Sequence, residues 1–254
     1  MGPFFSGPTA RIGESSGRNG RMVFGSCPGN DTGAGLLALA RKARYACEGC
    51  CDHLLKLRRG VFEVDESTGL WLIRHAAVDG PAGLIWGPDA PACLGDRASF
   101  DLLRAHLPEK AKVYASPARR TIDTARALML DPVPMAELAE QDFGEWTGHR
   151  HDDLAVASGK LYADFWHDAA RSRPPGGESF ADQIIRVRRG LEQVDAGSAI
   201  LVVHSGTVRA ALAIALDIEP EAALRFVIDP LSLTRIDRLK GSWRVTGVNL
   251  TFRS

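Results

Sequence analysis

The feature that most constrains this chain is an apolar run that ends abruptly in two cationic side chains, Leu72-Ile73 followed by Arg74-His75. Such a run is typical of a strand buried on both faces of a sheet. In open α/β sheets, side chains at the carboxyl end of a strand line the crevice in which ligands bind. Arg74 and His75 are therefore predicted to lie at the edge of a ligand-binding crevice.

The same design returns later in the chain. The apolar run 200–203 ends in His204-Ser205 and leads into a second apolar segment that predicts a helix over 206–217. A second histidine is thus expected at the end of a second buried strand. If the two strands are neighbours in a parallel sheet, both histidines face the same crevice.

A third strand is predicted over 112–116, and it is followed by a helix over 117–130. We expect Ser116 to cap this helix, with Pro117 at its first position and Arg119 and Arg120 in its first turn. Free backbone N–H groups at a helix N-terminus favour anions. Arg120 at this position therefore indicates an anion-binding site. We expect its neighbour Arg119 to lie on the helix surface.

A carboxylate is supplied by residues 137–152, which mix acidic side chains with glycines and aromatic residues and are predicted to form a functional loop. The candidates are Glu140, Asp142 and Glu145. Two histidines, two arginines and a carboxylate together are suited to phosphoryl transfer, in which positioning and electrostatics do most of the catalytic work.

These segments resemble the motifs of the histidine phosphatase superfamily, which contains cofactor-dependent phosphoglycerate mutase and α-ribazole phosphatase. The family pattern Leu-x-Arg-His-Gly is matched by Leu72 to Ala76, and Ser-x-x-x-Arg-x-x-x-Thr-Ala is matched by Ser116, Arg120, Thr124 and Ala125. The pattern Leu-x-Glu-x-x-(Tyr/Phe)-Gly is matched by Leu138, Glu140, Phe143 and Gly144. The family's second histidine is matched by His204. The motifs follow the family order over about residues 69–251. The turn 174–179 also resembles the Gly-Glu-Ser turn of the small phosphatases, although Ser179 is equally suited to cap a helix.

The chain departs from the family at two places. Ala76 stands where the family has glycine after the catalytic histidine, a small change that keeps bulk away from the phosphate. Residues 77–81 read Ala-Val-Asp-Gly-Pro, where the family often continues with an acidic residue, Ser or Thr, and then Asn. We expect the phosphate pocket to lack one or two polar contacts.

The resemblance implies a role for each site residue. His75 is the nucleophile that forms a phosphohistidine, and the nearby cations Arg74 and Arg120 lower its pKa and clamp the phosphoryl oxygens. His204, protonated beside a phosphate dianion, binds an oxygen opposite Arg120, and Ser205 adds a phosphate contact.

Glu140 is the general acid on motif register. A carboxyl group beside a phosphate dianion keeps its proton more readily, which suits protonation of the leaving alkoxide. Asp142 and Glu145 remain rivals for this role, because all three lie within one short segment.

Strands and helices alternate from Glu63 onward, which predicts an α/β fold. The expected elements are strand 70–75, helix 97–107, strand 112–116, helix 117–130, helices around 152–170 and 179–195, strand 199–204, helix 206–217, and antiparallel strands near 225–238 and 242–250. The pattern predicts a three-layer α/β/α sandwich with a mainly parallel mixed sheet, and the resemblance makes it phosphoglycerate mutase-like.

We expect two regions: an amino-terminal extension over 1–62, largely disordered or in short helices, and a catalytic domain over 63–254. Cys47, Cys50 and Cys51 cluster in the extension, but no second Cys/His pair follows to complete a zinc site, and we expect neither metal nor cofactor. A formal charge of zero gives no bias toward nucleic acid or membrane. With no apolar leader or membrane-length run, we expect a cytoplasmic protein; its oligomeric state is left open.

The favoured function is a metal-independent phosphomonoesterase that acts on a small phosphorylated metabolite, with α-ribazole 5'-phosphate as a candidate substrate. A phosphoglycerate mutase-type phosphotransferase is the first alternative, although about 190 residues carrying the motifs is close to a compact phosphatase. A non-catalytic module that binds phosphorylated ligands is the second. Segments 80–95, with Trp86, and 149–175, with Tyr162, Phe165 and Trp166, are expected either to cover the pocket or to pack into the core.

Overall fold

The computed structural model describes residues 67–252. The predicted extension over 1–62 and its cysteines lie outside these residues. The strands are β1 (Thr68–Arg74), β2 (Lys112–Ala115), β3 (Val133–Pro134), β4 (Gly197–Val203), β5 (Leu233–Leu239) and β6 (Ser242–Leu250). The helices are α2 (Arg97–Ala105), α3 (Arg119–Ala127), α4 (His151–Ala157), α5 (Gly159–His167), α6 (Phe180–Glu192), α7 (Ser205–Leu216) and α8 (Pro220–Ala223), with single 3-10 turns η2 (Ala136–Leu138) and η3 (Gly144–Trp146).

The strands form one mixed sheet in the order β3-β2-β4-β1-β5-β6. The pairs β1–β4, β2–β4 and β2–β3 are parallel, and β5 adds antiparallel to β1 before turning back into β6. The prediction of a mainly parallel sheet with a late antiparallel addition is therefore confirmed.

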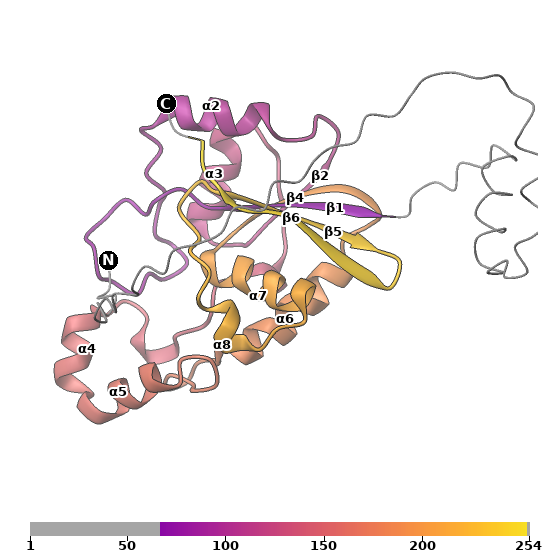
Figure 1. The fold of residues 1–254 in the computed structure, drawn as a ribbon. Coiled ribbons are helices and arrows are strands. Elements are labelled where there is room, and N and C mark those ends of the chain that lie inside the picture. The colour runs from indigo at the N-terminus through magenta and orange to yellow at the C-terminus, as the bar shows by residue number, and fades with distance from the viewer. Residues whose placement is uncertain (1–66, 253–254) are drawn as a thin grey trace, which may run out of the picture. The chain divides into compact units, whose positions relative to one another are not determined.

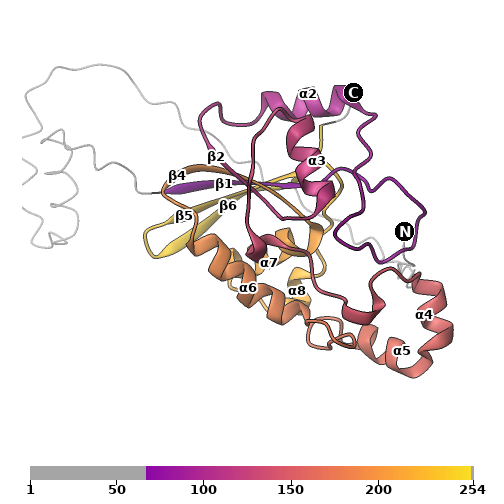
Figure 2. The same ribbon diagram turned by 180° about the vertical axis from the view of Figure 1, so that it is seen from behind.

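Helices cover both faces of the sheet, as the two opposite views show (Figures 1 and 2). On one face α2 and α3 pack Phe100, Leu103 and Leu128 against the sheet. On the other face α6 and α7 bury Val187 and Leu212. This is the predicted three-layer sandwich, and no helix among residues 67–252 has the length and hydropathy needed to cross a bilayer.

The central strands owe their position to their apolar runs. In β4 the last five residues, 199–203, are all buried. Leu201 faces the core beneath α6 and α7, whereas its neighbours Ile200 and Val202 face the core beneath α2 and α3. Alternate side chains of a strand point to opposite faces, so only a strand covered on both sides keeps such a run out of water.

Helix α3 begins later than predicted. Ala118, with an extended backbone, precedes its first residue Arg119, and no side chain caps the helix. The expectation that Ser116 caps the helix is wrong, because the Ser116 hydroxyl oxygen instead contacts Nε2 of His204 at 2.8 Å and accepts a bond from the Ala118 amide at 3.3 Å. Arg120 still lies in the first turn.

Two other boundaries differ from the prediction. The helical segment 152–170 is broken into α4 and α5 at Gly159, whose positive φ of 34° interrupts a right-handed helix. The strand expected from 225 begins only at Leu233. Carbonyls of Phe226 and Ile228 accept hydrogen bonds from arginine side chains, and Pro230 has no N–H to give to a ladder.

Candidate active site

Three adjacent parallel strands deliver three polar side chains to one edge of the sheet. The backbone N–H of His75 donates to the Val203 carbonyl at 2.9 Å, directly before His204, and the N–H of Ser116 donates to the Val202 carbonyl at 3.1 Å. Because β2, β4 and β1 are neighbours, the residues that follow them meet. The imidazole centroids of His75 and His204 are 5.0 Å apart.

The His75 ring is held in one tautomer. Its Nδ1 lies 2.6 Å from the Ala76 carbonyl, which can only accept, so Nδ1 carries the hydrogen. The other nitrogen, Nε2, accepts a hydrogen bond from Nε of Arg120 at 3.3 Å. Burial, and then the charges of His204, Arg120 and Arg74, lower the pKa of His75 well below its ordinary value. The imidazole is therefore neutral, with an Nε2 lone pair at the crevice.

Two buried polar atoms beside this ring have no hydrogen-bond partner within residues 67–252: Nε of Arg74 and Nδ1 of His204. Arg74 is otherwise anchored by Nη1, which donates to the Ile228 carbonyl. Buried polar groups are rarely left unpaired. Unmatched atoms of cationic or potentially cationic groups next to a neutral imidazole fit an anion with several acceptor oxygens.

The expected protonation of His204 refers to the phosphate-bound state, and the structure describes the ligand-free protein. Burial, followed by the charges of Arg120, Arg74 and Arg186, lowers the pKa of His204 well below its ordinary value. In the ligand-free protein it is neutral rather than protonated. A phosphate dianion bound beside His204 would supply the opposite charge that favours the imidazolium.

Arg120 is fixed by its place in α3. Its Nη1 donates to the Gly87 carbonyl at 2.8 Å, in addition to the bond from Nε to His75. The hydroxyl of Thr124 donates to the Arg120 carbonyl at 2.7 Å and accepts the Ala76 amide at 3.0 Å, which ties the helix to the backbone after His75. Ala76 is buried at 1 % exposure in the sheet core, so its methyl group stays out of the crevice.

Glu140 reaches the same crevice from the segment after η2. Its Oε1 accepts a hydrogen bond from Nε2 of Gln183 at 3.2 Å, and its Oε2 accepts the Gly206 amide at 3.5 Å. Burial lowers the pKa values of Arg74 and Arg120, and the negative charge of Glu140 opposes that shift at both. The carboxylate of Glu140 therefore lies within electrostatic range of both arginines and lines the same cavity.

The two rival carboxylates are less well placed. Asp142 lines the cavity, but it is exposed and its Oδ1 accepts the Gly144 amide at 2.8 Å, as in an ordinary turn. Glu145 is exposed and does not line the cavity. Arg119 is also exposed, pairs with Asp123 at 3.5 Å and does not line the cavity, so its predicted surface position is confirmed.

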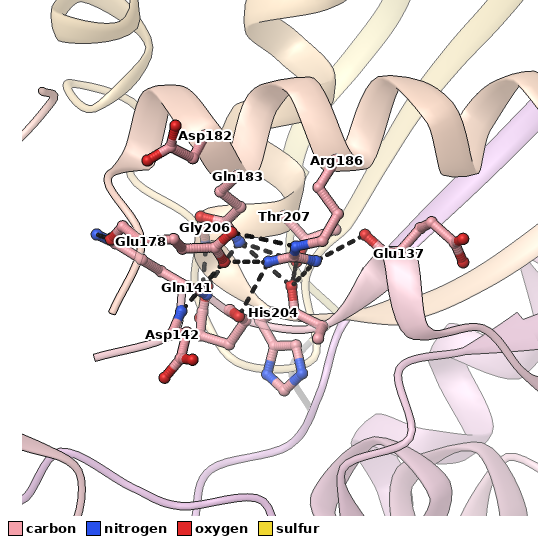
Figure 3. A network of polar contacts seen from close by, with 12 residues as sticks. Glu137, Gln141, Asp142, Glu178, Asp182, Gln183, Arg186, His204, Gly206 and Thr207 are labelled. Carbon is pink, nitrogen blue, oxygen red and sulfur yellow. Dashed lines mark hydrogen bonds and ion pairs between the residues drawn. The ribbon is translucent and has the colours of Figure 1, made fainter. Parts of the chain in front are cut away.

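Sequence reasoning missed three polar residues that line or support the site, namely Gln183, Arg186 and Arg209. Arg209 lines the cavity from α7, one turn after Ser205, and its Nε donates to the Phe226 carbonyl at 2.9 Å. The four-residue spacing from Ser205 was a usable signal, because it places both residues on one helix face. Gln183 and Arg186 gave no comparable signal; their contacts are the network of Figure 3.

The cavity has a volume of about 1250 Å³ and two kinds of wall. Its charged part holds Arg74, His75, Arg120, Glu140, His204, Ser205 and Arg209. Its other part is apolar and aromatic, with Trp86, Phe143, Phe165 and Trp166. Val78 and Pro81 also line it at positions where the family motif often carries polar residues.

Backbone hydrogen bonds hold together the two segments that were predicted to shape the pocket and that carry most of the aromatic wall. The Ile85 amide donates to the His149 carbonyl at 2.9 Å, and the Gly148 amide donates to the Ile85 carbonyl at 2.8 Å. Phe165, from the second of these segments, is buried against Trp146, with ring centroids 5.1 Å apart. Trp166, 47 % exposed, remains on the cavity side. The aromatic residues thus serve both the core and the cavity wall.

Within residues 67–252 no three His, Cys, Asp or Glu side chains are grouped as metal ligands. The family model that matches the chain is that of the histidine phosphatase superfamily (branch 1), over residues 70–251. The chain belongs to this family. The expected resemblance is therefore confirmed, and the matched range contains every strand and helix described above except the first residues of β1.

Relatives and solved structures agree with this membership. The bifunctional protein Rv2228c of Mycobacterium tuberculosis is 36% identical over 132 residues, which are 49% of this chain and 36% of that protein. A 2,3-bisphosphoglycerate-dependent phosphoglycerate mutase of Rhizobium etli is 32% identical over 109 residues, 38% of this chain and 52% of the mutase. The chain thus spans between about a third and a half of these relatives.

The structure of the alpha-ribazole phosphatase from Shigella flexneri superposes with a TM-score of 0.65 at 23% identity, over 73% of this chain and all of that one. At this identity the likeness establishes the fold. The phosphoglycerate mutase-like α/β/α architecture expected from the sequence is confirmed.

Proposed function

We propose that the chain is a phosphomonoesterase that hydrolyses a small phosphorylated metabolite through a phosphohistidine at Nε2 of His75. The observation that carries this proposal is the neutral His75, whose Nε2 lone pair is unprotonated and faces Arg120, beside unpaired buried atoms of Arg74 and His204. This arrangement provides a nucleophile and a receptor for the phosphoryl oxygens in one place.

In the first step, Nε2 of His75 attacks phosphorus and the bond from phosphorus to the leaving oxygen breaks. Protonated Glu140 gives its proton to that oxygen, so the product alcohol leaves neutral. Arg74, Arg120 and His204 donate to the non-bridging oxygens. Such preorganised donors lower the barrier by roughly 3 kcal/mol each.

In the second step, water attacks the phosphohistidine. The Glu140 carboxylate takes a proton from the water, the P–N bond breaks, and inorganic phosphate leaves with His75 neutral again. Dividing one displacement into two is the gain from covalent catalysis. The arginines and the protonated His204 supply the positive charge for both steps, so the mechanism requires no divalent ion. Ser205 contributes a further phosphate contact from the start of α7.

The aromatic wall supports a leaving group that carries a ring. Trp86 and Trp166 line the cavity together with the catalytic residues, and aromatic faces pack well against planar rings. α-Ribazole 5'-phosphate is our candidate substrate because it combines a phosphate ester with a ring system, and because a structural neighbour is named an alpha-ribazole phosphatase.

The test is to trap the intermediate. Wild-type protein is quenched during turnover of ³²P-labelled ester, with base in one sample and with acid in another. The protein should keep the label in base and lose it in acid, and His75→Ala should carry no label in either. His151→Ala is the matched control, since His151 lines the same cavity but does not follow a strand; it should still form the adduct. Label on serine or aspartate, or label that survives in His75→Ala, would contradict the mechanism.

A phosphotransferase of the phosphoglycerate mutase type is the second candidate, favoured by the 32% identity to the Rhizobium etli mutase. The two reactions separate when 2- and 3-phosphoglycerate are supplied with 2,3-bisphosphoglycerate. We expect phosphate release with little interconversion. Interconversion faster than phosphate release would assign the chain to the mutases, and absence of both reactions with every ester tried would favour a phospho-ligand-binding module.

A further inference from the structure

We propose that Glu178 and Arg186 form a clamp that positions the general acid Glu140, and that this is the function of the Gly-Glu-Ser turn. The proposal rests on the function proposed above, because it assigns a role to groups that support Glu140. The clamp joins three parts of the chain: the acid segment 137–142, the turn 174–179 and helix α6 (Figure 3).

Arg186 holds the backbone of the acid segment. Its Nη1 donates to the carbonyls of Glu137 at 2.8 Å and Ala139 at 3.1 Å, and its Nη2 donates to the carbonyl of Glu140 at 3.2 Å. Three acceptors within four residues therefore share one planar guanidinium. Its remaining donors face Glu178, so all three of its nitrogens are occupied and Arg186 lines the cavity without a free donor for substrate.

Glu178 holds the other end of the segment. Its carboxylate pairs with Arg186 and accepts the Asp142 amide at 3.1 Å. Its backbone carbonyl accepts Nε2 of Gln141 at 2.9 Å, and its backbone amide donates to the Asp142 carbonyl at 2.9 Å. The residues after Glu140 are thus fixed to the turn, and those before it are fixed to Arg186 of α6.

The two glycines of the contact allow the turn and the acid segment to meet backbone to backbone. A Cβ on Gly177 would lie 2.3 Å from the Asp142 carbonyl oxygen. A Cβ on Gly144 would lie 2.1 Å from the Pro175 carbonyl oxygen, and its φ is +52°. Neither position tolerates a side chain, because the blocking atoms belong to the backbone. Gly177 therefore precedes Glu178 for a steric reason.

Ser179 sets the direction of α6 from the same turn. Its hydroxyl accepts the Asp182 amide at 3.1 Å while the Asp182 carboxylate accepts the Ser179 amide at 2.9 Å, a reciprocal cap at the start of the helix. Gln183 and Arg186, three residues apart, then lie on one face. Gln183 contacts the Glu140 carboxylate and Arg186 contacts its backbone.

The Glu178–Arg186 pair is well suited to positioning. The two side chains are only 20% and 19% exposed, so water screens their attraction less than it does for a surface pair. A bidentate guanidinium–carboxylate contact also fixes orientation. General-acid catalysis requires the proton donor within hydrogen-bond reach of the leaving oxygen, so a displaced acid segment selectively slows esters whose alkoxide needs that proton.

The test is the leaving-group dependence of Arg186→Gln. We expect kcat/KM, which reports formation of the phosphohistidine, to fall by ~10²-fold for glycerol 2-phosphate, as when a general acid is misplaced. For p-nitrophenyl phosphate, whose leaving group departs without a proton, kcat/KM should fall by less than about threefold. The later hydrolysis step, in which Glu140 acts as base for both esters, does not enter kcat/KM. Arg186→Lys, which keeps the charge but not the fork, should recover only part of the loss.

Arg173→Gln is the matched control. Arg173 also joins the turn to α6, with Nε 2.6 Å and Nη2 2.8 Å from the Asp182 carboxylate, but it has no contact with the acid segment and does not line the cavity. Arg173→Gln should leave kcat/KM for both esters unchanged. If Arg186→Gln does not give a cooperative melting transition, Glu178→Gln replaces it, since this isostere keeps the shape and removes only the charge.

The outcomes distinguish the clamp from the function on which it rests. Equal losses on both esters, or an Arg186 variant that behaves like Arg173→Gln, would overturn the clamp even if Glu140→Gln shows the leaving-group contrast. If wild-type protein forms no phosphohistidine, or if Glu140→Gln shows no contrast, the proposed function itself fails.

Discussion

Nε of Arg120 donates a hydrogen bond to Nε2 of His75 across 3.3 Å, so the nitrogen proposed above as the nucleophile already has an arginine as its partner. This contact keeps Nε2 an acceptor and disfavours its protonation. A bound phosphate dianion offers Arg120 a stronger, charge-assisted acceptor. In the proposed mechanism, substrate binding therefore exchanges the partner of Arg120 and releases the lone pair on Nε2 of His75.

Arg120→Ala should lower kcat/KM by roughly 10²–10³-fold, the usual cost of removing one preorganised donor to a developing charge. Arg119→Ala is the control, because Arg119 is the neighbouring residue but is exposed, pairs with Asp123 and does not line the cavity. Steady-state kinetics with p-nitrophenyl phosphate measure both. A similar effect in the two variants would show that Arg120 acts through helix α3 rather than at the phosphate.

The free protein should lose stability steeply in acid because His75 and His204 are buried and neutral. Their pKa values are lowered in the folded state, whereas in the unfolded chain they return to about 6.5. Below that pH the unfolded chain binds more protons, so the free energy of unfolding falls by up to ~1.4 kcal/mol per pH unit for each histidine.

Urea denaturation at pH 7.5, 6.5 and 5.5 tests this expectation. His204→Gln should remove about half of the pH slope that the pair contributes, whatever its effect on stability at pH 7.5. His167→Gln, at an exposed position on α5, should leave the slope as in wild type. If the free energy of unfolding falls equally with pH in all three proteins, the two buried histidines do not control the loss of stability in acid.

Glu140→Gln should slow alkyl phosphates by ~10²–10⁴-fold and p-nitrophenyl phosphate far less, because only the alkoxide needs a proton on departure. The measurement is kcat/KM on the two esters in parallel, which reports phosphoryl transfer to His75 and excludes the hydrolysis step that both esters share. Asp142→Asn is the comparison, since Asp142 lines the same cavity but caps its own turn. A leaving-group contrast in Asp142→Asn instead of Glu140→Gln would transfer the acid role.

Gly206→Ala offers a steric test of the same carboxylate. The added Cβ would lie 2.2 Å from Oε1 of Glu140 and 2.8 Å from Oε1 of Gln183, the far ends of two flexible side chains that would both have to move aside. Alanine also favours the first turn of α7 by up to about 1 kcal/mol relative to glycine. We expect Gly206→Ala to have an unchanged or higher Tm and a lower kcat/KM for alkyl phosphates. The control Gly95→Ala, with open space around it, should change neither quantity. A lower Tm with unchanged kinetics would contradict the placement of Glu140.

Activity should withstand dialysis against EDTA, because arginines and His204 supply the positive charge in the proposed mechanism. Vanadate should inhibit competitively, since it adopts the five-coordinate geometry of phosphorus during transfer. The measurement is kcat before and after dialysis, with metal content determined on the same samples. Activity lost on dialysis and restored by a divalent ion would refute the metal-independent mechanism.

The sequence by itself determined most of the strands and helices and which polar residues gather at the crevice. Apolar runs that end in His75 and His204 require strands buried on both faces, and residues that end neighbouring parallel strands must meet. Strand β6 was predicted at its observed bounds, and Ser179 caps α6 as expected, because burial period and capping chemistry are local properties.

Only the tertiary structure decided which long-range acceptor each polar group finds. Ser116 resembles a helix cap in sequence but contacts His204, 88 residues away. Arg186 resembles a surface helix residue but holds carbonyls 46 to 49 residues away. Periodicity reports whether a side chain is buried, but a hydrogen bond depends on distance and angle between groups brought together by packing. The contacts that hold Glu140, the proposed general acid, therefore depend on packing between the turn 174–179 and the segment 137–142.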